Sequence, residues 1–181
     1  METTTSAEQQ KWEATVRAAA EKATAEQLWP LFEDFFGLHK WFPGLQICRG
    51  VAGANGEPGC IRYCAGFKGI KPQSESSPAT AKATATATAA WSKERLRWVD
   101  RRRMTLSYEI VDSNIGFTSY VSTVRVTDGA AGGAAAVVEW SITVDPVAGL
   151  ELADLAAKYR VGLEAMVKNM EAAIVAGTSI S

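Results

Sequence analysis

The sequence predicts an α+β fold in which a seven-stranded antiparallel sheet wraps around a long C-terminal helix, with two short helices after the first strand. Short segments that alternate apolar and polar residues recur along most of the chain, joined by tight turns, as in an antiparallel meander. The last segment, 147–174, instead carries apolar residues at intervals of three and four, which indicates one face of a helix. A helix with one long apolar face needs a broad apolar partner, and the sheet is the partner that the chain offers.

A chain of 181 residues, with 47% hydrophobic and 22% charged residues, has the length and composition of one globular domain. We expect a flexible leader at residues 1–10, a single domain at 11–176 and a flexible tail at 177–181. The formal net charge of −1 argues against nucleic acid or a membrane as the main partner, because both favour a basic surface. The polar N-terminus lacks the apolar region of a secretory signal, so the expected location is cytoplasmic.

The first strand is predicted at residues 11–18, where apolar and polar side chains alternate. The segment 24–44 then predicts two short helices. Thr24 followed by Gln27 matches the capping box that begins a helix, and leucine and phenylalanine residues follow with helical spacing. Gly37 is expected to end the first of these helices.

Six further strands are predicted from period-two alternation and intervening turns, at residues 45–53, 59–67, 91–99, 103–111, 117–126 and 134–144. The long helix is predicted to run from Val147 to Ile174. Between the third and fourth strands lies a low-complexity segment, residues 71–90, which is rich in Ala, Thr, Ser and Pro and has no large apolar anchor. Such a segment cannot bury enough surface to offset the entropy of ordering it, so we expect a mobile insertion.

Few of the common catalytic motifs are present. His39 is the only histidine, so neither a zinc site nor a Ser-His-Asp triad is expected. The three cysteines are expected to be reduced and buried. Cys60 and Cys64 would lie on one face of a strand, but roughly 13 Å apart, which exceeds the limit of about 7 Å between the Cα atoms of a disulfide.

Alternation predicts two polar side chains that point into the core. Glu94 shares its strand face with Leu96 and Trp98, and the face with these large apolar residues should be the inner one. Tyr120 shares its face with Val124 and other valines, so it should also point inward. An ionisable residue and a phenol inside the sheet indicate a pocket whose side chains can take part in a reaction.

The orientation of Arg62 stays open from the pattern alone. Alternation groups Arg62 with Cys60 and Cys64, opposite Ile61 and Tyr63, which slightly favours the solvent side. An inward Glu94, however, would need a partner, because burying an unpaired carboxylate costs several kcal/mol. Arg62 is a plausible partner for it.

The order of the elements, together with the segments GCIRY, WSKERL and VEWSI, resembles the plant Bet v 1/START-like helix-grip superfamily, which includes polyketide cyclase-like proteins. The resemblance spans residues 12–174. Within the superfamily, these segments are most similar to those of lachrymatory factor synthases. The resemblance implies the helix-grip fold and places Arg62 inside the cavity.

The resemblance also implies an activity, the isomerisation of a 1-alkenyl sulfenic acid to a thial S-oxide in an internal cavity. No cofactor is expected because the net change is a moved proton. In this interpretation Arg62 and Glu94 are catalytic. Substrate binding is assigned to four aromatic residues, Tyr108, Tyr120, Tyr159 and Trp140.

A second interpretation is a non-catalytic carrier or receptor of small hydrophobic ligands, since a fold does not fix a function. Abscisic-acid receptors share the fold, but their gate motif is absent here and the 71–90 insertion stands in its place. Their latch motif is replaced by residues 114–117. Either way, the expected partner is a small organic ligand, and the expected state is a monomer or weak dimer.

Overall fold

The computed structural model describes residues 10–70, 89–130 and 134–177. The predicted leader, insertion and tail lie almost entirely outside these ranges. The predicted fold class is confirmed, with elements in the order β1 (Trp12–Ala20), α1 (Ala25–Glu33), the 3₁₀ helix η1 (Phe35–Lys40), β2 (Ile47–Ala52), β3 (Ile61–Ala65), β4 (Trp91–Asp100), β5 (Thr105–Ser113), β6 (Val121–Asp128), β7 (Ala136–Val144) and α2 (Leu152–Val175).

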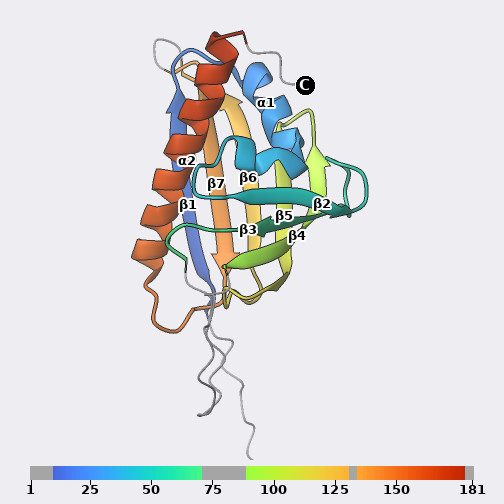
Figure 1. Cartoon of the computed structure of the whole chain (residues 1–181). Coiled ribbons are helices and arrows are strands. Elements are labelled where there is room, and N and C mark those ends of the chain that lie inside the picture. Colours follow the sequence, from blue (N-terminus) through green and yellow to red (C-terminus); the bar gives the residue numbers. More distant parts are fainter. Residues whose placement is uncertain (1–9, 71–88, 131–133, 178–181) are drawn as a thin grey trace, which may run out of the picture.

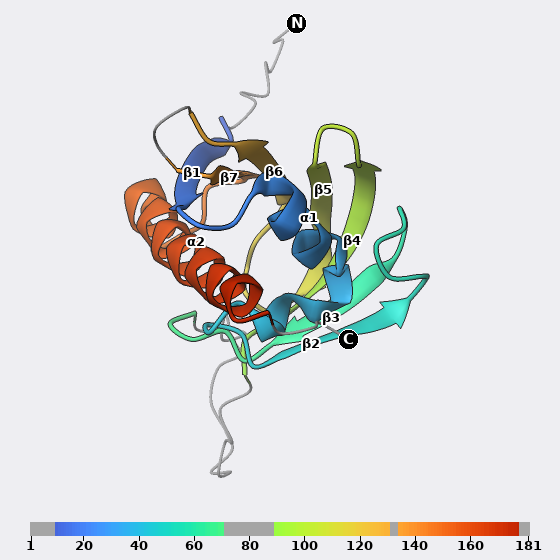
Figure 2. The same ribbon diagram turned by 90° about the horizontal axis from the view of Figure 1, so that it is seen from above.

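The seven strands form one antiparallel sheet in the order β1-β7-β6-β5-β4-β3-β2. The first strand therefore pairs with the last, and β1 and β2 are the two edges. In Figure 1 the long helix α2 runs along the β1 and β7 side of the sheet. Figure 2 shows the sheet bent around α1, so that β2 and β3 turn back toward α2. This arrangement is the helix-grip fold.

The core lies between the concave face of the sheet and the helices. Strand β7 shows the cleanest alternation, with every second residue from Ala136 to Val144 buried. The stripe predicted on α2 faces this layer, and its fully buried members are Leu155, Leu163, Met166, Val167 and Met170. The period-two and period-3.6 patterns meet in one apolar layer, as the sequence predicts.

Helix α1 begins at the predicted capping box. The Thr24 side chain accepts a hydrogen bond from the backbone N–H of Gln27, and the Gln27 side chain accepts one from the backbone of Thr24. The predicted end at Gly37 is wrong, because the chain leaves the α-helical conformation at Asp34 (φ −67°, ψ 67°). Gly37 instead lies inside η1.

Replacing Thr24 with alanine is expected to lower the free energy of unfolding by about 1 kcal/mol, because the backbone N–H of Gln27 in the first turn of α1 loses its side-chain acceptor. Urea denaturation would measure the change. Thr24→Ser is the matched control, since it retains the capping oxygen and should stay close to the wild type. An equal loss in both variants would contradict a role for the cap.

Helix α2 begins five residues later than predicted, at Leu152 instead of Val147. Residues 147–150 form a turn, in which the Leu150 N–H donates to the Val147 carbonyl. Gly149 has φ +78°, which a right-handed helix does not allow. The side chains of this turn are apolar and so extend the helical pattern into a segment that is not helical.

The side-chain direction of Trp98 also differs from the prediction. Leu96 is buried, with 1% of its surface exposed, whereas Trp98 is 42% exposed. The register of β4 against β5 shifts between these two residues. Such a bulge inserts an extra residue, and the strand face that each later residue occupies is exchanged.

Among the described residues, no helix is long and apolar enough to cross a membrane.

Candidate active site

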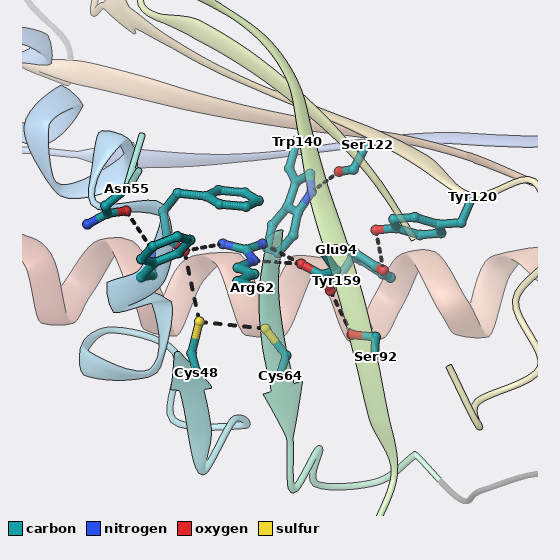
Figure 3. Close-up of polar contacts among 12 residues, drawn as sticks. Cys48, Asn55, Arg62, Cys64, Ser92, Glu94, Tyr120, Ser122, Trp140 and Tyr159 are labelled. Carbon is teal, nitrogen blue, oxygen red and sulfur yellow. Dashed lines mark hydrogen bonds and ion pairs between the residues drawn. The ribbon is translucent and has the colours of Figure 1, made fainter. Parts of the chain in front are cut away.

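The centre of the site is a buried ion pair between neighbouring strands. Arg62 on β3 lies directly opposite Glu94 on β4, and their side chains meet on the concave side of the sheet (Figure 3). The Nη2 and Nε atoms of Arg62 lie 2.6 and 2.7 Å from Oε2 of Glu94. Only 4% of Arg62 and 6% of Glu94 is exposed. The inward Glu94 and its expected pairing with Arg62 are thus observed.

The solvent side that alternation slightly favoured for Arg62 is wrong. Cys60 and Cys64, on the same face, are 1% and 0% exposed and behave as small apolar residues. Tyr63 is only half-buried because it packs on the outer face, where its ring stacks on Trp91 at 5.9 Å. The large aromatic residue therefore lies on the outside and the thiols face the core.

The guanidinium of Arg62 has partners beyond the carboxylate. Its Nη1 donates to the Phe35 carbonyl at 2.9 Å, and its carbon atom Cζ lies 3.9 Å from the centre of the Phe35 ring and 4.8 Å from that of Tyr108. Burial is the largest single influence and lowers the pKa of Arg62, but the Glu94 carboxylate, together with smaller contributions from Cys64, Cys48 and Tyr108, raises the pKa above its ordinary value. Arg62 is therefore held as a cation between two aromatic rings.

The two oxygens of Glu94 have different surroundings. Oε2 accepts both contacts from Arg62, whereas Oε1 accepts one hydrogen bond, from the Ser92 hydroxyl at 2.9 Å. A carboxylate offers about four acceptor positions, so Oε1 keeps capacity for another donor. This oxygen is the one that can take a proton from a ligand while Oε2 remains paired with Arg62.

Three tyrosines lie near the ion pair: Tyr108 and Tyr120 are buried, and Tyr159 is partly buried. The hydroxyl oxygens of Tyr120 and Tyr159 are 2.6 Å apart, and the rings of Tyr159 and Trp140 meet edge to face at 5.1 Å. Burial raises the pKa of Tyr108, and a smaller contribution comes from the Glu94 carboxylate; burial is also the main cause of the raised pKa values of Tyr120 and Tyr159. All three therefore remain neutral hydroxyls that can donate or accept hydrogen bonds.

A row of aromatic rings leads from the surface to Arg62. Phe117 stacks on Tyr120 with ring centres 5.6 Å apart, Tyr120 lies 6.3 Å from Tyr108, and Tyr108 lies 5.8 Å from Phe35. Phe117 also lines a surface cleft of about 530 Å³, between the β5–β6 connection and the turn before α2. The row therefore separates this cleft from the ion pair.

The cavity beside the ion pair is small, at about 20 Å³. Arg62, Tyr108 and Trp140 line it, whereas the other three predicted site residues (Glu94, Tyr120 and Tyr159) do not. The space holds about one water molecule. The interior is thus closed to an organic ligand in this conformation, because aromatic side chains fill the space between sheet and helices.

Sequence reasoning missed the contacts of Ser92 and of the Phe35 carbonyl. Ser92 could have been found, because it lies two residues before Glu94 and so shares its strand face. Nothing in the sequence indicates the Phe35 carbonyl, whose position depends on how η1 packs on β3.

Within the described residues, no three His, Cys, Asp or Glu side chains gather closely enough to hold a metal ion.

Comparison with known proteins agrees with this architecture. A family model described as "Polyketide cyclase / dehydrase and lipid transport" matches residues 11–174. The protein XoxI from Bacillus cereus has a similar structure, with 20% identity, a TM-score of 0.61, and coverage of 90% of this chain and 95% of that one. Major latex-like protein 151 from Panax ginseng is similar at 15% identity and a TM-score of 0.65, with 90% and 96% coverage. At these identities the two structures show a shared fold.

Proposed function

We propose that this chain, which belongs to the polyketide cyclase/dehydrase and lipid transport family, is a cofactor-independent isomerase that converts a 1-alkenyl sulfenic acid to a thial S-oxide. The family points to a small hydrophobic ligand. The observation that carries the finer proposal is the buried pair of Arg62 and Glu94. A carrier does not need such a pair to bind an apolar ligand, and replacing a buried ion pair by apolar residues of similar volume is often neutral or stabilising.

The reaction needs one proton to move. Oε1 of Glu94 accepts the proton of the sulfenic O–H, and the electrons of that bond stay on the oxygen. A lone pair of the sulfur then forms the C=S bond, while the π electrons of the C=C bond take the proton back from Glu94 at the alkene carbon farther from sulfur. Arg62 stabilises the negative charge that develops on the substrate oxygen, and Glu94 acts in turn as base and acid.

The tyrosines supply orientation in this proposal. Tyr108 contacts the Arg62 guanidinium with its ring and lines the small cavity, so its side chain forms part of the wall that would hold the alkenyl group. Tyr120 and Tyr159 share a hydrogen bond that a ligand oxygen can replace. A few polar groups on an otherwise apolar wall are typical of sites for small ligands.

Access to the pair requires a conformational change, because a cavity of about 20 Å³ does not admit the substrate. The cleft beside Phe117 is the proposed approach, since the next ring inward is Tyr120 and the one after that is Tyr108. Rotation of these rings would open a path to Arg62 without moving a strand.

A second candidate is a non-catalytic carrier or receptor, and the existing contacts of the ion pair favour it. Each of the three nitrogen atoms of Arg62 already has an acceptor. A pair held in this way can be purely structural, fixing β3 and β4 beside η1. In this candidate the ligand would occupy space opened next to the aromatic row.

The discriminating experiment supplies the wild-type protein with a sulfenic acid that a separate enzyme generates from its sulfoxide precursor. The isomerase is expected to form the thial S-oxide many-fold faster than the reaction without protein. Product would be measured by gas chromatography. Absence of product, together with binding of a hydrophobic fluorescent probe, would contradict the isomerase proposal and favour the carrier.

A further inference from the structure

We propose that Cys48 and Cys64 form a redox-active dithiol, which hydrogen peroxide converts to an intramolecular disulfide. The two residues lie directly opposite each other on β2 and β3. Their Sγ atoms are 3.6 Å apart, and both are free thiols. The inference does not rest on the proposed isomerase activity, because it concerns a cluster on the other side of Arg62 from Tyr120 and Tyr159 (Figure 3).

The backbone already has the geometry that a disulfide requires. Residues directly opposite in an antiparallel pair have Cα atoms about 4.5 or 5.5 Å apart, and disulfides span about 4.4–6.8 Å. The Sγ atoms need to approach by about 1.5 Å to reach bonding distance. Rotation of the two side chains can supply this movement without a change of strand register.

The surroundings favour Cys48 as the attacking thiol. The hydrogen bond from Cys64 lowers the pKa of the Cys48 thiol to about 6, burial opposes this shift, and the Arg62 guanidinium adds to it. The thiolate is the nucleophilic form. Cys48 is only 5% exposed, but it lies on β2, an edge strand of the sheet, so peroxide can reach it through local opening of this edge.

Cys60 provides an internal contrast in the same hairpin. It is 1% exposed, and burial raises the pKa of its thiol. No other cysteine of the chain lies opposite it, since Ile61 pairs with Ala52 at this end of the hairpin. Cys48 and Cys64 are also buried, so the difference lies in the partner: a buried thiol with a raised pKa and no cysteine opposite it has no route to a disulfide, and oxidation should distinguish Cys60 from the pair.

The reaction balances with peroxide as the oxidant. The Cys48 thiolate attacks one peroxide oxygen and breaks the O–O bond, which gives a sulfenic acid on Cys48 and, after protonation, one water. The Cys64 sulfur then attacks the sulfenic sulfur, and the S–O bond breaks to release a second water. The two thiols lose two electrons and two protons, and peroxide is reduced to two waters.

The dithiol and the ion pair share one acceptor, the carbonyl oxygen of Phe35. This oxygen accepts a hydrogen bond from Nη1 of Arg62 at 2.9 Å and one from the Cys48 thiol at 3.9 Å. A disulfide removes the S–H donor and fixes β2 to β3 beside Arg62. The disulfide would close the loop between residues 48 and 64, and closing a loop of this length is expected to raise the melting temperature by roughly 5–10 °C.

The test treats the folded wild type with hydrogen peroxide at neutral pH, alkylates the remaining thiols in denaturant and maps unreduced peptides by mass spectrometry. The expected product links Cys48 to Cys64 with the loss of two hydrogens, leaves Cys60 alkylated, and reverts with dithiothreitol. Cys60→Ala, the matched control, should retain the link. Cys64→Ala should abolish the link and also slow the oxidation of Cys48, because it removes the hydrogen bond that lowers the pKa of the Cys48 thiol.

Two results would overturn the proposal. The first is equal oxidation of all three cysteines, which would mean that the cross-strand pairing gives no selectivity. The second is a link that forms only after the protein is unfolded in denaturant, which would mean that the folded pair is inert. Both results are read on the wild type, so they do not depend on whether a variant folds.

Discussion

Replacing Arg62 with methionine is expected to lower the free energy of unfolding by about 3–5 kcal/mol, the cost of leaving a buried charge without its partner. Glu94 is 6% exposed, and Oε2 has no other hydrogen-bond donor than Arg62 among the described contacts. Methionine has a similar length and removes the cation. The decrease in the free energy of unfolding therefore comes mainly from the unpaired carboxylate and only a little from a cavity. Urea denaturation followed by circular dichroism measures it.

Strand β4 offers a matched control for this variant. Arg95 pairs with Glu109 at 2.8 Å, but its side chain is 48% exposed, so Arg95→Met should cost less than about 1 kcal/mol. The double variant Arg62→Met with Glu94→Leu should recover most of the stability, because it removes both charges. Equal costs for Arg62→Met and Arg95→Met would contradict the importance of burial.

Replacing Glu94 with glutamine is expected to reduce turnover of the sulfenic acid by about 10²-fold or more, because general acid–base catalysis by one group contributes this much. Glutamine keeps the shape and one oxygen for Arg62 but cannot carry the proton. Ligand binding should remain nearly unchanged. The assay for thial S-oxide, with folding checked by circular dichroism, measures the effect.

The control for Glu94→Gln is Glu109→Gln on the neighbouring strand β5. Glu109 also pairs with an arginine, but on the outer face of the sheet, so its loss should leave turnover unchanged. Full activity in a folded Glu94→Gln variant would mean that another group moves the proton. In a carrier, neither substitution should change ligand affinity appreciably.

The fold was predictable because two periodicities dominate it. Alternation in β7 and the apolar stripe of α2 both reflect burial on one face, which is the property that a sequence records most directly. Helix boundaries were less predictable. The apolar pattern before Leu152 continues through a turn at Gly149, because the turn packs on the core without being helical.

The site was predictable only in part, because its geometry depends on packing between elements. Glu94 was placed inward partly on the strength of Trp98, which a bulge turns outward. Arg62 was ambiguous because a pattern cannot tell which of two mixed faces is buried. The pairing of Cys48 with Cys64 depends on the register of the hairpin. Spacing along one strand relates only Cys60 to Cys64, so it does not reveal this pair.

The small void beside Arg62 has a consequence for the response to hydrostatic pressure. Pressure favours the state of smaller volume, and the volume change of a transition scales with the voids that it removes or creates. The closed interior encloses only about 20 Å³ at this point, so compression gains little there. We therefore expect hydrostatic pressure to destabilise the folded state only slightly through this part of the core.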